Sequence, residues 1–318
     1  MSKQHTPSAY GGKGWSPRLT SLQDEIGRLW HACGIDSEWS PLKAVLLHRP
    51  GEELDDLASP EAVYMLEPLD TTSVRGQHDG IARTLREHGV TVDYVNPART
   101  PPPNLLFVAD LMFMTPEGAI VGRPASTVRA GEECHVARRL ADLGIPILKT
   151  VRGNGVFEGA DAAWLDERTV LLATGLRTNQ EGADQVASVL AELGVDVIQV
   201  GLPYGSMHLM GELRFADRDL AIARPGWTPF AAVQALREHG YTVLFTPDEE
   251  EVTRGMALNF ITLGPRKILM SADNPITQAF YEAAGITCVV AETDEIGKAA
   301  GGIGCMTGIV ERALVGTS

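Results

Sequence analysis

A helix-stopping glycine followed by a short β-branched run recurs five times, and this repeat limits the possible folds of the chain most strongly. The five glycines are Gly89, Gly144, Gly194, Gly240 and Gly285, and each ends a helix-like segment. Glycine is the usual residue just past a helix end, and the apolar runs that follow are typical of strands. The glycines recur every 45 to 55 residues, which is the length of one supersecondary unit.

One or two further strands are expected ahead of each helix, at 119–122, 169–172, 220–223 and 267–270. Each unit therefore reads as strand, strand, helix, strand. Five such units predict an α/β fold, namely a closed five-bladed propeller of ββαβ units about a pseudo-fivefold axis. The alternative is an open doubly wound sheet, which the expected antiparallel strand pairs disfavour.

The repeat also divides the chain. Residues 39–318 are predicted to form the single propeller domain, and residues 1–38 an N-terminal arm. Within the arm, residues 21–32 are predicted to form a short amphipathic helix, and tryptophans such as Trp15 and Trp30 are expected to dock the arm on the body.

Charge and composition exclude several classes of function. The chain of 318 residues carries a net charge of -14, which disfavours nucleic-acid and anionic-membrane partners. No stretch approaches the length of a membrane span, and no signal peptide is recognisable. The four cysteines are too widely spaced for a zinc site, so a cytoplasmic protein with reduced thiols is expected.

One of these cysteines is a candidate nucleophile. Cys305 lies in the sequence Gly-Gly-Ile-Gly-Cys-Met-Thr, and glycines allow the backbone to approach a ligand closely. A lone cysteine in such a loop, with a histidine elsewhere, is typical of thiol catalysis. The alternative is a small buried core residue, which is the common place for a free cysteine.

Polar side chains occur at equivalent places in four of the units, each expected on the first strand. They are Asp110, Glu158, His208 and Asn259. Equivalent positions in a ring lie close to its axis, so Asp110, Glu158 and His208 are expected to meet Cys305. A thiol, an imidazole and an orienting carboxylate form a complete catalytic set. Singly, each has a structural alternative, and for Asn259 a turn is the favoured interpretation.

Two arginines follow strands and begin helix-like stretches. Arg129 and Arg177 are candidate clamps for a substrate carboxylate, because a guanidinium binds a carboxylate through two parallel hydrogen bonds. A surface ion pair is the alternative for each.

With these motifs assembled, the sequence from about residue 40 to 315 resembles the guanidine-modifying, or pentein, superfamily. That group includes dimethylarginine dimethylaminohydrolases, arginine deiminases, arginine dihydrolases and amidinotransferases. The resemblance is carried by motifs that occur in the same order, at residues 47–51, 107–110, 129–132, 157–161, 177–178, 208–209 and 304–307.

The resemblance implies a role for each candidate. Cys305 is the nucleophile, His208 the general acid and base, and Glu158 the acid that orients it. Asp110 holds the guanidinium, and Arg129 and Arg177 hold a substrate carboxylate. Asp161, in the same motif as Glu158, is expected near the substrate. No metal or organic cofactor is required, and the partner is a small guanidino molecule such as arginine or a derivative.

The sequence departs from parts of the family at Met210. Deiminases and amidinotransferases usually carry an aspartate there, whereas the dimethylarginine hydrolases lack it. Met210 therefore favours hydrolysis of an arginine-like, N-substituted guanidine. Amidino transfer and arginine dihydrolysis share the same catalytic set and remain alternatives, and a homodimer remains open. A non-catalytic relative, a ribosome-binding anti-association factor, is disfavoured because this chain retains the cysteine, histidine and acid.

Overall fold

The strands of the computed structural model, which describes residues 6–55, 57 and 59–316, form five three-stranded sheets. The sheets are β3-β4-β5, β6-β7-β8, β9-β10-β11, β12-β13-β14 and β15-β1-β2. The strands run, in chain order, β1 Leu42–Leu47, β2 Thr91–Tyr94, β3 Met112–Thr115, β4 Gly118–Val121, β5 Ile147–Thr150, β6 Ala162–Asp166, β7 Thr169–Thr174, β8 Asp196–Gly201, β9 Leu213–Asp217, β10 Leu220–Ala223, β11 Thr242–Phe245, β12 Ile261–Gly264, β13 Lys267–Ser271, β14 Thr287–Ala291 and β15 Gly308–Arg312.

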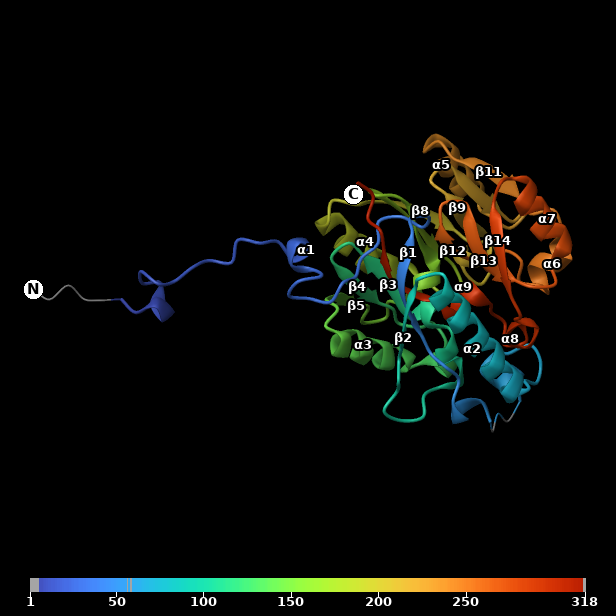
Figure 1. Cartoon of the computed structure of the whole chain (residues 1–318), viewed down its shortest axis with the longest axis horizontal. Helices are drawn as coiled ribbons and strands as arrows, with labels where there is room; N and C mark the ends of the chain where they lie inside the picture. Colours follow the sequence, from blue (N-terminus) through green and yellow to red (C-terminus); the bar gives the residue numbers. More distant parts are fainter. Residues whose placement is uncertain (1–5, 56, 58, 317–318) are drawn as a thin grey trace, which may run out of the picture.

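Each sheet has the same topology. Its first two strands are antiparallel, and its third strand is parallel to the second and follows a helix. The fifth sheet is closed by residues from both ends of the ring, because β15 pairs antiparallel with β1 and β1 pairs parallel with β2. The predicted propeller of five strand-strand-helix-strand units is confirmed, and the open doubly wound sheet is excluded (Figure 1).

One longer helix crosses each unit, and the other helices are short turns. The helices are α1 Leu22–Glu25, α2 Thr71–Glu87, α3 Glu132–Leu143, α4 Gln180–Glu192, α5 Phe230–Glu238, α6 Glu249–Thr253, α7 Pro275–Ala283, α8 Asp294–Gly297 and α9 Ile303–Met306. The five repeat glycines follow α2, α3, α4, α5 and α7 with φ between 74° and 86°. Glycine adopts this left-handed conformation most readily because it has no Cβ atom, which is why it recurs there.

The helices pack on the sheets through one apolar face. In α2 the buried residues Val74, His78, Ile81, Ala82 and Leu85 fall on one side of the helix at the expected spacing. Asp70 caps the start of the helix, and its side chain accepts hydrogen bonds from two backbone amides of the first turn. Burial of this face against the sheets stabilises the outer layer of the ring.

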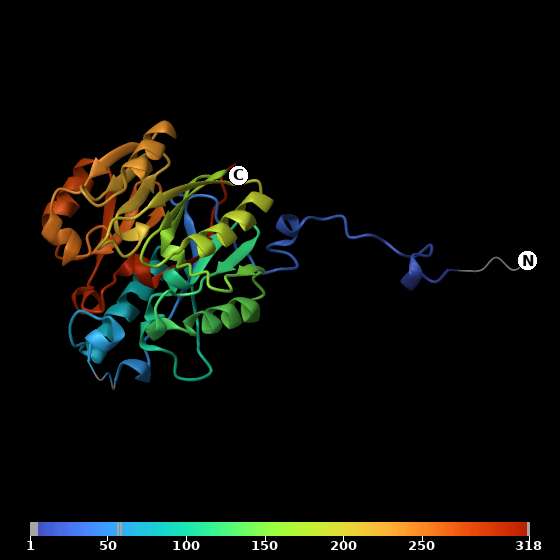
Figure 2. The same ribbon diagram turned by 180° about the vertical axis from the view of Figure 1, so that it is seen from behind.

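The N-terminal arm differs from expectation. A helix over 21–32 was predicted, but α1 spans only Leu22–Glu25. It has a capping box at Ser21 and Asp24, and then the chain turns at Gly27, whose φ is 78°. Trp15 is 57% exposed, so it does not dock on the body, and the segment before α1 extends away from the ring in Figures 1 and 2.

The residues just before the first strand belong to the body in space. Cys33, Ile35 and Ser37 are buried, and the backbone of Gly34 pairs with β15. The division between arm and domain at residue 38 stays a prediction.

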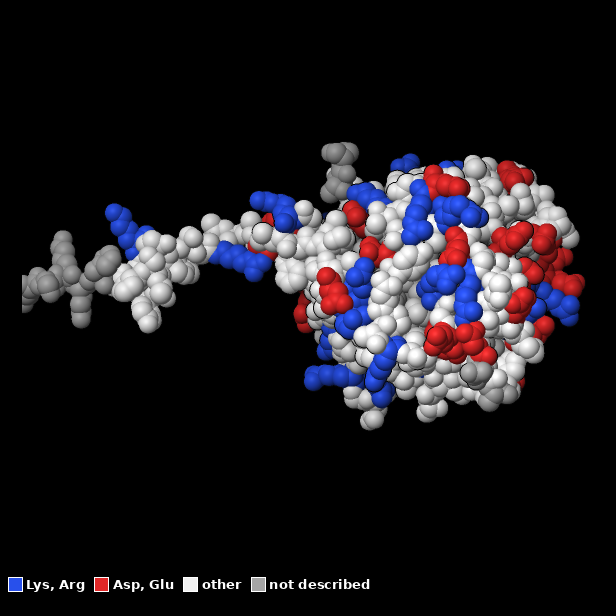
Figure 3. All heavy atoms as spheres, turned by 60° about the horizontal axis from the view of Figure 1, so that its bottom comes forward, with Lys and Arg blue, Asp and Glu red and all other residues white. Residues whose placement is uncertain are grey.

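The outer surface carries charges of both signs. Over the face of the body shown in Figure 3, basic and acidic side chains lie next to one another. Among the described residues, no helix combines the length and the apolar character needed to cross a membrane.

Candidate active site

Of the polar residues singled out by the repeat, Asp110, Glu158 and His208 lie in or directly before short 3-10 turns. Asn259 lies just before β12, so none of the four is on a strand as expected. Asp110 is in the turn Val108–Leu111, which leads into β3. Glu158 immediately precedes the turn Gly159–Asp161 ahead of β6, and His208 precedes the turn Leu209–Gly211 ahead of β9. Each turn therefore presents its polar side chain at the same end of its sheet. This common place explains how residues about 50 positions apart in the chain meet.

A glycine allows two of these turns to touch. A Cβ atom at Gly159 would lie 2.2 Å from the carbonyl oxygen of Met112 and 2.5 Å from that of Ala109. No side chain fits at such distances, so the close approach of the Asp110 and Glu158 turns requires glycine at this position.

His208 lies between two carboxylates. Its Nε2 is 2.7 Å from Glu158 Oε2, and its Nδ1 is 3.8 Å from Asp110 Oδ1. Burial alone lowers the pKa of the imidazole, but Asp110, Glu158 and Asp161 outweigh burial and raise it to about 9. The ring is therefore protonated at neutral pH and can donate a proton.

Glu158 is the carboxylate that stays ionised. Burial raises its pKa, but His208, Arg129 and Arg177 outweigh burial and lower it to about 2. Its oxygens also accept from the backbone amide of Ala125 at 3.0 Å and from Arg177 Nη1 at 3.4 Å. A fixed anion with these partners holds the imidazole in one orientation.

Cys305 lies in α9 against Asn259. The Asn259 side-chain amide donates to the thiol sulfur at 2.9 Å, and its carbonyl oxygen accepts from the Cys305 backbone amide at 3.1 Å. The sequence predicted only a turn residue at Asn259, and this prediction did not include its two contacts with Cys305. The available signal was its repeat position, which matches those of Asp110, Glu158 and His208.

Arg129 is bound to protein groups in this structure. Its side chain is 4% exposed, its Nη1 is 2.5 Å from Asp110 Oδ2, and its Nη2 is 2.8 Å from Glu132 Oε2. The remaining donors point to Glu132 and to the carbonyl oxygens of Asn104 and Phe107. Arg129 is thus paired with Asp110, and its role as a clamp for a substrate carboxylate stays a prediction. The other oxygen of Asp110, Oδ1, is buried and accepts no hydrogen bond from the described residues.

Arg177 and Asp161 occupy different surroundings. Arg177 lines the same cavity as Cys305 and His208, and its hydrogen bond to Glu158 is long. The two oxygens of Asp161 accept from the Thr178 hydroxyl and the Leu209 backbone amide, and its place near the substrate stays a prediction. Asp161 therefore fixes the turn after His208. Burial raises its pKa to about 6.

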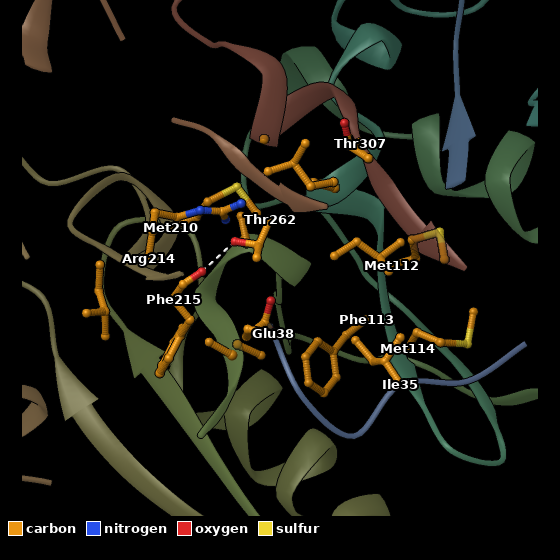
Figure 4. Close-up of a pocket in the computed structure, with 18 residues that line it drawn as sticks. Ile35, Glu38, Met112, Phe113, Met114, Met210, Arg214, Phe215, Thr262 and Thr307 are labelled. Carbon is orange, nitrogen blue, oxygen red and sulfur yellow. Dashed lines mark hydrogen bonds between the residues drawn. The ribbon is translucent and has the colours of Figure 1, made fainter. Parts of the chain in front are cut away.

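Two cavities meet at Cys305 and His208. The first has a volume of about 20 Å³, and its lining includes Asp110, Arg129 and Arg177 as well as Tyr64 and Phe107. The second has a volume of about 300 Å³. Its wall includes three methionines and one tryptophan, Met207, Met210, Met256 and Trp227, together with the charged residues Glu212 and Arg224. Met210 also lines a third cavity, of about 50 Å³, among the inner strands (Figure 4).

Asp110, Glu158 and His208 also resemble a set of metal ligands, because their ligand atoms lie within 4.8 Å of one another. The Arg129 guanidinium, however, already lies 2.5 Å from Asp110 and 3.6 Å from Glu158. A second cation there would be repelled by it, so these residues do not fit a metal ion.

The amino-acid sequence is similar to those of known enzymes. Residues 228–312 match the family model for arginine deiminase. A dimethylarginine dimethylaminohydrolase from Streptomyces coelicolor is 26% identical, with 84% of this chain and 96% of that protein covered. The enzyme of the same name from Pseudomonas aeruginosa is 24% identical over 73% of this chain and 86% of its own length.

Solved structures share the fold. The Pseudomonas aeruginosa enzyme has a TM-score of 0.71 at 22% identity, covering 85% of this chain and 100% of its own. A cyanobacterial arginine dihydrolase domain reaches a TM-score of 0.72 at 17% identity, covering 86% and 99%. An amidinotransferase from Microseira wollei reaches 0.70 at 14% identity, covering 88% and 97%.

The chain is therefore a sequence and structural relative of the guanidine-modifying enzymes of the pentein superfamily, and has their five-bladed fold. Its relatives include dimethylarginine dimethylaminohydrolases, an arginine dihydrolase and an amidinotransferase, which catalyse different reactions.

Proposed function

We propose that the protein is a cysteine-dependent hydrolase that acts on the guanidinium carbon of an arginine-like, N-substituted guanidine. The observation that carries this proposal is the meeting of Cys305, the His208–Glu158 pair and Asp110 at one cavity. A thiol, a protonated imidazole and a buried carboxylate are the groups that guanidine hydrolysis needs.

Asp110 is the proposed acceptor for the guanidinium. Its Oδ2 is paired with Arg129, while its Oδ1 is buried, lies 3.8 Å from His208 and accepts no hydrogen bond from the part of the chain that the structure describes. An N–H group of the substrate would satisfy that oxygen, because an unpaired buried acceptor is costly. Burial and the charge of Asp110 raise the pKa of the Cys305 thiol, so a bound guanidinium that neutralises Asp110 also favours the thiolate.

The chemistry then follows in two steps. Cys305 first loses its proton to solvent when the bound guanidinium favours the thiolate. The thiolate then bonds to the guanidinium carbon, and the carbon–nitrogen bond to the departing amine breaks as His208 donates its proton to that nitrogen. The thiouronium that remains is attacked by water, which gives a proton back to His208. The carbon–sulfur bond then breaks, and a urea-type product leaves.

The cavity lined by Met207, Met210 and Met256 supports a substituted guanidine. It lies beside Cys305 and His208, its volume of about 300 Å³ exceeds what a bare amino group needs, and Met210 offers no charge to bind one. Flexible apolar methionines pack well around alkyl groups. The same space also admits an amine acceptor, so amidino transfer is the second candidate function.

A panel of guanidines tests the proposal. The protein is incubated with arginine, methylated arginines and decarboxylated arginine, with and without an added amine, and products and Cys305 adducts are identified by mass spectrometry. We expect methylated arginines to react fastest, with release of the alkylamine and a ureido acid. Decarboxylated arginine should react poorly, because Arg177 then has no carboxylate to bind.

Other outcomes favour other reactions. Product that forms only with added amine, and contains that amine, indicates transfer; release of ornithine and two ammonia molecules indicates dihydrolysis. If no guanidine forms an adduct on Cys305, the proposed chemistry is wrong.

Met210→Asp is expected to shift the preference toward unsubstituted arginine. An aspartate would add a charge-assisted hydrogen bond to a bare guanidinium, worth roughly 1.5–3 kcal/mol, and would remove apolar surface from the cavity. The ratio of kcat/KM for arginine to that for dimethylarginine should rise about tenfold or more relative to wild type. Met210→Leu, which keeps an apolar side chain, should leave this ratio nearly unchanged. An unchanged ratio in Met210→Asp would remove Met210 from substrate recognition.

A further inference from the structure

Arg214 is a buried cation just behind the helix that carries Cys305. It lies on β9 and is 8% exposed. Its Nη2 donates to the carbonyl oxygen of Phe260, and its guanidinium carbon lies 5.5 Å from the centre of the Phe260 ring. Figure 4 shows the Arg214 side chain beside Met210 at the wall of the 50 Å³ cavity.

This guanidinium approaches the nucleophile loop closely. A Cβ atom at Gly304 would lie 3.4 Å from Arg214 Nη2, 2.9 Å from Asn259 Oδ1 and 3.2 Å from the Phe260 carbonyl oxygen. Gly304 therefore gives Arg214 and Asn259 access to the backbone beside Cys305. Asn259 in turn contacts both the amide and the sulfur of Cys305.

Arg214 also lacks the usual partner of a buried cation. Among the described residues no carboxylate lies within 4.0 Å of it, whereas Arg129 has three. Buried charges are normally paired, because burial without a counter-ion is costly. Glu38 lines the same 50 Å³ cavity, and its negative charge acts on the Arg214 guanidinium. Cys305 is the other ionisable group whose charge acts on Arg214.

We propose that Arg214 is a positioning residue whose buried charge stabilises the Cys305 thiolate, while Asn259 donates a hydrogen bond to the same sulfur. An arginine stays charged at any accessible pH, and its field is weakly screened inside the protein. Cys305 is the nearby group that gains from this field when it loses its proton. This role rests on the proposed function of Cys305 as the nucleophile.

The direction of the pKa change agrees with the geometry. Burial and the charge of Asp110 raise the pKa of Cys305, while Gly302, Asn259 and Arg214 oppose them. Further charged groups share cavities with Cys305, and their effects must be held constant in any test. They are His208, Arg129, Arg177, Glu212 and Arg224.

The test measures the pKa of Cys305 itself. The rate of iodoacetamide alkylation at Cys305 is followed against pH by peptide mass spectrometry, which separates it from the exposed Cys134. Arg214→Gln, which retains a hydrogen-bond donor without the charge, should raise the apparent pKa by about one unit or more. Alkylation near neutral pH should then slow about tenfold. Arg214→Lys should restore most of the rate, because it retains the charge.

Controls separate charge from packing and from loss of folding. Arg218→Gln, on the exposed end of the same hairpin, should match wild type. Glu38→Gln leaves Arg214 intact but removes the negative charge that acts on it. The charge of Arg214 is then less compensated, so the pKa of Cys305 should fall. If Arg214→Gln does not fold, this second variant decides: an unchanged or higher pKa overturns the proposal.

Failure of this proposal is distinguishable from failure of the proposed function. Alkylation of Cys305 is measured without any substrate turnover. An unchanged Cys305 pKa in Arg214→Gln would therefore contradict only the proposed role of Arg214. Absence of guanidine adducts on Cys305 in the substrate panel sinks the proposed function, whatever the alkylation rates show.

Discussion

Cys305→Ala is expected to abolish turnover of every guanidine substrate and the formation of any covalent adduct. The two-step chemistry requires a carbon–sulfur bond, and alanine offers no group that replaces it. Binding should survive, because the groups proposed to hold the substrate, Asp110 and Arg177, remain in place. Turnover is measured by amine release, binding by calorimetry and the adduct by intact-protein mass spectrometry.

Cys134→Ala provides the matched control, because Cys134 is an exposed thiol on α3 and far less hindered. It should retain wild-type activity. A Cys305→Ala protein that keeps more than a few per cent of its activity would show that Cys305 is not the nucleophile.

His208→Ala is expected to lower kcat about a hundredfold or more, which is the usual loss when a general acid and base is removed. Both steps should slow, because the same imidazole donates a proton to the amine and later accepts one from water. Rapid-quench mass spectrometry should show slower amine release and slower breakdown of the Cys305 adduct. If only one of these two steps became slower, His208 would act in that step alone.

The pH profile gives an independent check. The pKa of His208 is raised to about 9, so the imidazole is protonated below that pH and activity should fall as pH rises through it. The attraction between protonated His208 and the carboxylates of Asp110, Glu158 and Asp161 stabilises the fold. This contribution is fully present below the ordinary histidine pKa near 6.5 and is lost as pH rises through about 9. Glu158→Gln removes one partner, so the alkaline fall should move to lower pH; a profile that stays in place would rule out His208 as the acid.

Much of the fold could be predicted from the sequence because the repeat is local. Each glycine that ends a helix has the same conformation for the same reason, and the five units show the same strand pairing. The short arm helix could not be predicted as well. The apolar pattern over 21–32 suggested a longer helix, but the turn at Gly27 ends the segment after one helical turn.

The site was partly predictable. Repeat positions brought out Asp110, Glu158 and His208, which the ring places in contact. The pairing of buried charges was not predictable, because it depends on which turns touch in space. Arg129 pairs with Asp110 and Glu132, and Asp161 accepts a hydrogen bond from the Leu209 backbone amide, and neither contact was predicted. Arg214 carries no signal in the sequence, since a buried and an exposed arginine in a strand look alike.

The pairing of β15 with β1 has a consequence for synthesis of the protein. Cys305 lies three residues before β15. More than 250 residues of chain separate β15 from β1, the strand with which it pairs. Contacts between such distant segments form late, because closing a long loop is entropically costly. The thiol therefore reaches its partners only after β15 has been made and has paired with β1. Under the proposed function, an incomplete chain that holds the imidazole and both carboxylates would stay inert toward guanidines until the ring closes.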